Sequence, residues 1–217
     1  MSLALYVLAV ATLAALAYGL LHSGRSRTGL MPSVTKTLAT ALLALAGWLS
    51  GAPDWAIAGL VLGAAGDFAL SRPGTPAFLA GMAAFALGHL AYAWGFSGGW
   101  AHTGALPVTL WVALAAMLVL GGVTLRWIAP RAGVLAWPVR GYTLVIGAMA
   151  LTAAGMADGP GVGMIQLGVT LFVASDLVLA LGLFVATDAY ARRLAAQVLW
   201  PLYWGGQLLI LLGALCC

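Results

Sequence analysis

The sequence predicts an all-α fold, a polytopic transmembrane helix bundle with about eight spanning helices in a single domain over residues 1–217. Three observations predict it: the composition, a series of apolar segments of spanning length, and the placement of the basic residues. The chain is 64% hydrophobic and 6% charged, whereas a soluble domain carries about 25% charged residues. Most of its surface must therefore face lipid, where the backbone has to satisfy its own hydrogen bonds.

The apolar segments are each long enough to be a spanning helix, which needs about 20 residues. Gly, Pro and charged residues separate them, as in RPGTP at 72–76 and ATDAYARR at 186–193. The first segment has no preceding positive charge, so we interpret it as a retained helix and not as a cleaved signal. In chain order, the expected helices cover about 2–22, 33–51, 54–71, 76–97, 106–127, 138–156, 161–186 and 195–215.

All nine basic residues flank the odd-numbered loops between these helices. By the positive-inside rule the odd loops face the cytoplasm, which puts both termini outside. We expect a bacterial inner (cell) membrane location. The charges are scattered over several loops and form no basic patch, so no nucleic-acid partner is expected. The nine are Arg25, Arg27, Lys36, Arg72, Arg126, Arg131, Arg140, Arg192 and Arg193.

Two aspartates lie inside apolar segments. The chain has no Glu and five Asp, of which only Asp67 and Asp176 lie inside apolar runs of the expected helices and not in or beside a loop. A carboxylate in the bilayer is costly and is by default a candidate for function. The alternative is a structural role, as an interhelical hydrogen bond or an ion pair with an Arg near the inner loops.

Other polar residues also lie in apolar helices. His89 shares a helical face with aromatic residues, and Tyr203 and Gln207 are four residues apart, so each group faces one way. Lys36 and Tyr142 lie near inner helix ends. The alternatives are a packed histidine, hydrogen bonds between helices, and a lysine that extends its amine to the interface.

The depth of these residues follows from the helical rise of about 1.5 Å per residue. The polar groups start at the cytoplasmic ends and reach the middle of the bilayer, while the outer half is apolar. The pattern predicts a pocket that is open to the inner leaflet and holds an amphiphile, with Asp67 and His89 not in contact. Depths are about 4–6 Å for Lys36, Asp67 and Tyr142, about 12–16 Å for Asp176 and Tyr203, and about 18–20 Å for His89 and Gln207.

Taken together, these residues resemble the lysoplasmalogenase (YhhN-like) family of eight-helix membrane proteins. The resemblance implies an ether hydrolase that cleaves the vinyl ether of lysoplasmalogen, a lysophospholipid, into a fatty aldehyde and glycerophosphocholine or glycerophosphoethanolamine. The matching pieces, in family order, are Lys36, Gly66-Asp67, Gly81…Phe85…His89…Tyr92, Tyr142, Ser175-Asp176 and Tyr203…Gln207.

Vinyl ether hydrolysis needs an acid that protonates the β-carbon and an anion that stabilises the resulting oxocarbenium ion, like the carboxylate pair of glycosidases. We expect Asp176 as the acid and Asp67 as the base, or the reverse, with His89 as the third catalytic residue. No metal or cofactor is expected. Lys36 is expected to hold the phosphate, with Arg72 or Arg140 as further candidates. The other expected substrate-binding residues are Tyr92, Tyr142, Ser175, Tyr203 and Gln207.

Two other functions remain possible on sequence alone. A small-molecule or lipid transporter often has broken helices at matching positions in its two halves. Here Pro201 and Gly205-Gly206 interrupt the last helix without a matching break in the fourth. A non-catalytic membrane scaffold is the second alternative, but it has no need for two intramembrane carboxylates.

Overall fold

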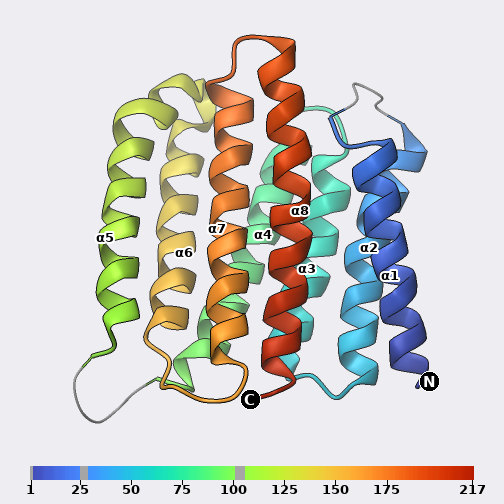
Figure 1. The fold of residues 1–217 in the computed structure, drawn as a ribbon. Helices are drawn as coiled ribbons and strands as arrows, with labels where there is room; N and C mark the ends of the chain where they lie inside the picture. The colour runs from blue at the N-terminus through green and yellow to red at the C-terminus, as the bar shows by residue number, and fades with distance from the viewer. Residues whose placement is uncertain (1, 25–28, 101–105) are drawn as a thin grey trace.

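A computed structural model describes residues 2–24, 29–100 and 106–217. Within these residues the chain forms eight α-helices and no strand beyond a single bridge between Trp100 and Met156 (Figure 1). The predicted all-α fold is confirmed. The helices are α1 (Leu3–Leu21), α2 (Leu30–Leu49), α3 (Asp54–Leu70), α4 (Thr75–Ser97), α5 (Val108–Val123), α6 (Ala136–Ala154), α7 (Val162–Phe184) and α8 (Ala189–Ala214).

Two helix boundaries differ clearly from the sequence-based ones. α8 begins at Ala189 and not near 195, because the Asp188 side chain accepts a hydrogen bond from the Ala191 N–H and caps an additional polar turn. Between α5 and α6 the chain continues through a π-helical turn, Thr124–Ile128, and two short 3-10 turns. These turns carry the chain across the end of the bundle.

The helices have the length and composition of membrane spans. Seven helical segments are long and apolar enough to cross a membrane, and α3, with 17 residues, is at the short end of the usual range of about 17–25. The protein is therefore an integral membrane protein.

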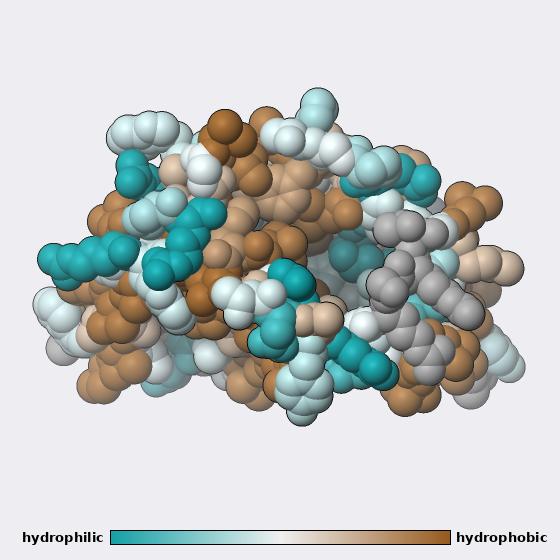
Figure 2. Space-filling model, turned by 90° about the horizontal axis from the view of Figure 1, so that it is seen from above, coloured by the Kyte–Doolittle hydropathy of each residue, from teal (hydrophilic) through white to brown (hydrophobic). Residues whose placement is uncertain are grey.

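Both chain ends lie at one end of the bundle, opposite the α3–α4, α5–α6 and α7–α8 connections (Figure 1). Seen from the side of these connections, the molecule gathers hydrophilic side chains around a hollow (Figure 2). Arg25 and Arg27 are outside the described residues. The assignment of this polar end to the cytoplasm stays a prediction.

Small residues let the inner helices pack closely. A Cβ on Gly168 of α7 would lie 2.7 Å from the carbonyl oxygen of Gly206 in α8, so these helices meet backbone to backbone. Gly59 of α3 similarly faces the ring of Tyr92 on α4. α5, in contrast, lies at the edge of the bundle, and none of its residues is buried.

Candidate active site: two buried polar clusters

The polar side chains inside the bundle form two separate clusters. The first, here called the Asp67 cluster, joins α2, α3 and α8 and consists of Lys36, Thr40, Asp67 and Tyr203. The second, the Asp176 cluster, joins α4, α6 and α7 and consists of His89, Tyr142 and Asp176.

In the Asp67 cluster, both carboxylate oxygens have close partners. The Lys36 Nζ lies 3.0 Å from Oδ1 of Asp67. The Thr40 and Tyr203 hydroxyls donate to Oδ2, at 2.8 and 2.9 Å. The Asp67 side chain is 0% exposed and that of Lys36 is 15% exposed. A cation and two hydroxyl donors are the partners that an ionised carboxylate needs when it is removed from water.

Two more of the expected residues lie beside the Asp67 cluster. The Tyr92 hydroxyl donates a short hydrogen bond to Oε1 of Gln207, and both side chains are buried. Gly63 leaves the space for this amide, because a Cβ there would lie 2.7 Å from Nε2 of Gln207. In the described residues that Nε2 has no hydrogen-bond partner.

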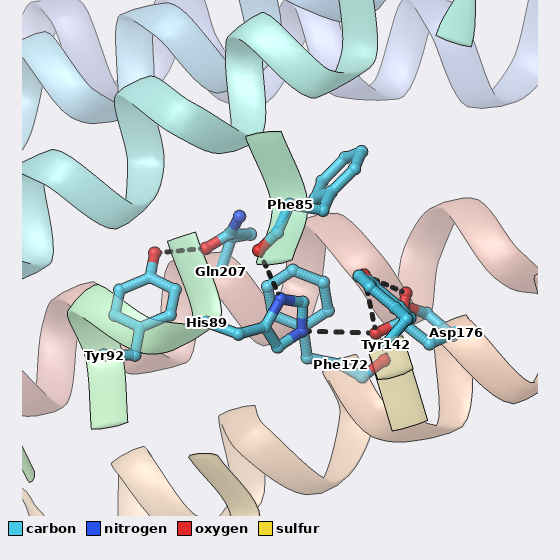
Figure 3. Close-up of polar contacts among 8 residues, drawn as sticks. Phe85, His89, Tyr92, Tyr142, Phe172, Asp176 and Gln207 are labelled. Atoms are coloured by element: carbon cyan, nitrogen blue, oxygen red, sulfur yellow. Dashed lines mark hydrogen bonds and ion pairs between the residues drawn. The ribbon is translucent and has the colours of Figure 1, made fainter. Parts of the chain in front are cut away.

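The Asp176 cluster is more loosely held. Nε2 of His89 lies 3.2 Å from Oδ2 of Asp176, and the Tyr142 hydroxyl lies 3.4 Å from both carboxylate oxygens (Figure 3). The Asp176 side chain is 10% exposed, whereas that of His89 is 0% exposed. Asp176 is thus the more accessible of the two intramembrane aspartates.

The position of one hydrogen on His89 follows from the geometry. Nδ1 of His89 lies 2.6 Å from the carbonyl oxygen of Phe85, one turn earlier in α4 (Figure 3). A carbonyl can only accept, so Nδ1 carries a hydrogen. Nε2 makes no hydrogen bond within the described residues. Its distance of 3.2 Å from Oδ2 nevertheless places a base and an acid close enough for a proton to pass between them.

Aromatic rings separate the two clusters. The Phe172 ring centroid lies 4.5 Å from that of His89 and 5.3 Å from that of Tyr203. Asp67 and His89 fall in different clusters, as the depths predicted. The two aspartates also have different partners, so no contact supports the sequence-based expectation that Asp67 and Asp176 form one acid–base couple.

An apolar cavity lies against the Asp176 cluster. About 640 Å³ of empty space, part of it open to the outside, lies between α4, α5, α6 and α7, and Asp176, Tyr142, Thr124 and Thr143 are the polar lining residues. Its lining near the start of α4 and the end of α7 is apolar and includes Phe78 and Phe184. The cavity thus lacks the polar mouth that the sequence predicted. It places an apolar lining beside the carboxylate of Asp176.

Several expected substrate-binding residues lie elsewhere. Lys36, Tyr203 and Gln207 line neither this cavity nor the groove described below. The Ser175 hydroxyl donates to the carbonyl of Phe172 in its own helix. Of the nine expected site residues, His89, Tyr142 and Asp176 form the cluster at the cavity.

Sequence reasoning missed the threonines of both sites. Thr40 lies one helical turn after Lys36, and that spacing was a signal that both face Asp67. Thr124 and Thr143 gave no comparable signal, because single threonines are common in apolar helices. Within the described part of the chain, no three His, Cys, Asp or Glu side chains come together as metal ligands would.

Comparison with known proteins assigns the family. The YhhN family model matches residues 31–214. The chain belongs to the YhhN family. The human lysoplasmalogenase TMEM86B is 36% identical over 161 residues, which are 72% of this chain and 61% of the human protein. The rat lysoplasmalogenase TMEM86B is 33% identical over 166 residues, 76% of this chain and 64% of the rat protein.

This YhhN-family chain thus spans less than two thirds of the length of these curated relatives, at 61% and 64%. No solved structure matches it.

Proposed function

We propose that this protein hydrolyses the vinyl ether bond of a lysoplasmalogen and releases a fatty aldehyde and glycerophosphocholine or glycerophosphoethanolamine. The names of the human and rat relatives and the YhhN family support this reaction. The observation that carries the proposal is the close contact between His89 and Asp176 beside an apolar cavity. A vinyl ether is an apolar group whose hydrolysis begins with a proton transfer to carbon.

In the first step the Asp176–His89 pair acts as a general acid. A proton carried by the pair, whose Nε2 and Oδ2 atoms lie 3.2 Å apart, forms a C–H bond with the β-carbon of the vinyl ether, using the electrons of the carbon–carbon double bond. The α-carbon and the ether oxygen then share the positive charge of an oxocarbenium ion. The Asp176 carboxylate and neutral His89 remain, and the negative charge stabilises the cation in a site with little water.

In the second step the same pair acts as a general base. A water oxygen bonds to the α-carbon, and its proton returns to the pair, which restores the starting state. The hemiacetal then loses its hydroxyl proton and breaks the bond to the ether oxygen, which takes up a proton as the glycerol hydroxyl. One water is consumed, and Tyr142 serves as a positioning residue that donates to Asp176.

This mechanism gives the Asp67 cluster a different role from the expected one. Asp67 and Lys36 neutralise each other, which supports a framework role that joins α2, α3 and α8. Arg140 is then a better candidate than Lys36 for the substrate phosphate. It lies on α6, the helix that carries Tyr142, and its buried Nε has no hydrogen-bond partner in the described residues.

The test is to incubate the purified protein with a lysoplasmalogen and to measure the released aldehyde. We expect aldehyde from the vinyl ether substrate and none from the matching saturated 1-alkyl ether, which has no double bond to protonate. A protein that carries lysophospholipid across a vesicle membrane without releasing aldehyde would be a transporter, and the proposed function would be wrong.

A further inference from the structure

A second, larger cavity opens along α5, α6 and α7. This groove has about 1880 Å³ of empty space, and no charged residue lines it. Its polar residues are already hydrogen-bonded to backbone carbonyls: Thr109 to Ala154, Gln166 to Ala153 and Thr170 to Gln166. The groove therefore presents an apolar surface to any occupant.

The groove is continuous with the cavity at Asp176. Leu120 of α5 and Leu177 of α7 line both. From there the groove runs along α7 to Gly163 and along α5 to Val108, toward the end of the bundle that holds the chain termini. A path thus leads from the proton donor into the other half of the predicted membrane.

The groove is long enough for one hydrocarbon chain. The part of α7 between Gly163 and Leu177 rises about 21 Å, which exceeds the ~15 Å of hydrocarbon in one leaflet. Small residues form much of the wall, including Ala113 and Ala116 on α5 and Ala174 on α7. Val112 and Val119, which also line the groove, are exposed, so the groove opens sideways to lipid.

We infer that this groove is the binding site for the alkenyl chain of the substrate and sets the chain lengths that the protein accepts. The inference rests on the proposed function. With the vinyl ether at Asp176, the chain passes Leu120 and Leu177 and ends near Val108. Ala174 lies near the reacting end of the path and Ala113 near its far end. The substrate enters between lipid-facing helices and does not have to leave the bilayer.

Bulky substitutions along the groove test this assignment. The readout is the chain-length ratio, which is kcat/KM for a long-chain lysoplasmalogen divided by kcat/KM for a short-chain one. We expect Ala113→Trp to lower this ratio by about tenfold or more, the effect of about two methylene groups losing their buried contacts. Ala174→Trp should lower kcat/KM for both chain lengths. Ala148→Trp is the matched control, because Ala148 is exposed on α6 and lines neither cavity. An active protein whose chain-length ratio is unchanged in Ala113→Trp would overturn the inference.

A readout that needs no turnover separates this inference from the proposed function. A saturated 1-alkyl lysophospholipid with a photoreactive group at the end of its chain should label residues near Val108 and Val112, and Ala113→Trp should remove that label. If aldehyde release fails but this labelling succeeds, the reaction is wrong and the groove assignment stands. Labelling elsewhere, or crosslinks between two copies through α5, would overturn the assignment.

Discussion

The Asp67 and Asp176 clusters each place one aspartate inside the bundle, but they surround it differently. Asp67 has no exposed surface and is in contact with a lysine and two hydroxyl donors. Asp176 keeps some exposure, has longer contacts to Tyr142 and lines a cavity. Burial of a carboxylate alone therefore does not identify a reactive group. Asp176, with longer contacts and a cavity beside it, is the candidate for chemistry, whereas Asp67, with close partners on both oxygens, is the candidate for stability.

The largest difference between the clusters should appear when the His89 imidazole is removed. His89→Gln keeps a polar side chain of similar length but cannot transfer a proton, so we expect kcat to fall by at least about 10²-fold, the low end for general acid–base catalysis. Steady-state aldehyde release measures this. His22→Gln is the matched control, because His22 lies at the end of α1, outside both clusters. Normal turnover in folded His89→Gln would remove His89 from the mechanism.

In the Asp67 cluster, the main effect should be on stability. Lys36→Met leaves Asp67 buried without its cation, and we expect a loss of about 3 kcal/mol in the free energy of unfolding. The double variant Lys36→Met/Asp67→Asn should recover part of this loss, because no unpaired charge remains. Denaturation in detergent measures both. If Lys36→Met has wild-type stability but a raised KM, Lys36 contacts the substrate phosphate after all.

A smaller effect is expected at Tyr142. Its hydroxyl lies 3.4 Å from Asp176, a long contact, so Tyr142→Phe should cost about 1 kcal/mol, or about fivefold in kcat. KM should change little, since the hydroxyl orients Asp176 and does not bind the head group. Substrate-saturation curves separate the two constants. A loss of 10²-fold or more would make Tyr142 a proton donor in its own right.

The sequence predicted the fold well because composition and apolar segment length determine it directly. It also identified residues of the candidate site, but it did not predict how those residues are arranged. The helical rise places Lys36 and Asp67 at one depth, but depth does not say which way a side chain points around its helix. The contact between His89 and Asp176 joins α4 and α7, and nothing local in either segment encodes how these helices turn toward each other.

The expected pairing of the two aspartates was drawn from chemistry and not from geometry. Two intramembrane carboxylates suit a two-carboxylate mechanism, but the contacts offer each of them a partner of its own. Lys36 lies near Asp67, and His89 lies near Asp176. A tertiary structure was needed to find that one aspartate and one histidine lie in contact, an arrangement that suits the proposed acid and base roles.

The central claim is that the reaction takes place at Asp176 and not at Asp67. The most direct test compares aldehyde release by Asp176→Asn and Asp67→Asn, each expressed per folded molecule. Both changes remove a charge and keep the shape. We predict that Asp176→Asn lowers kcat by at least about 10²-fold, whereas the folded fraction of Asp67→Asn, though less stable, stays within about tenfold of the wild type. The opposite ranking, or equal losses in both variants, would contradict the account.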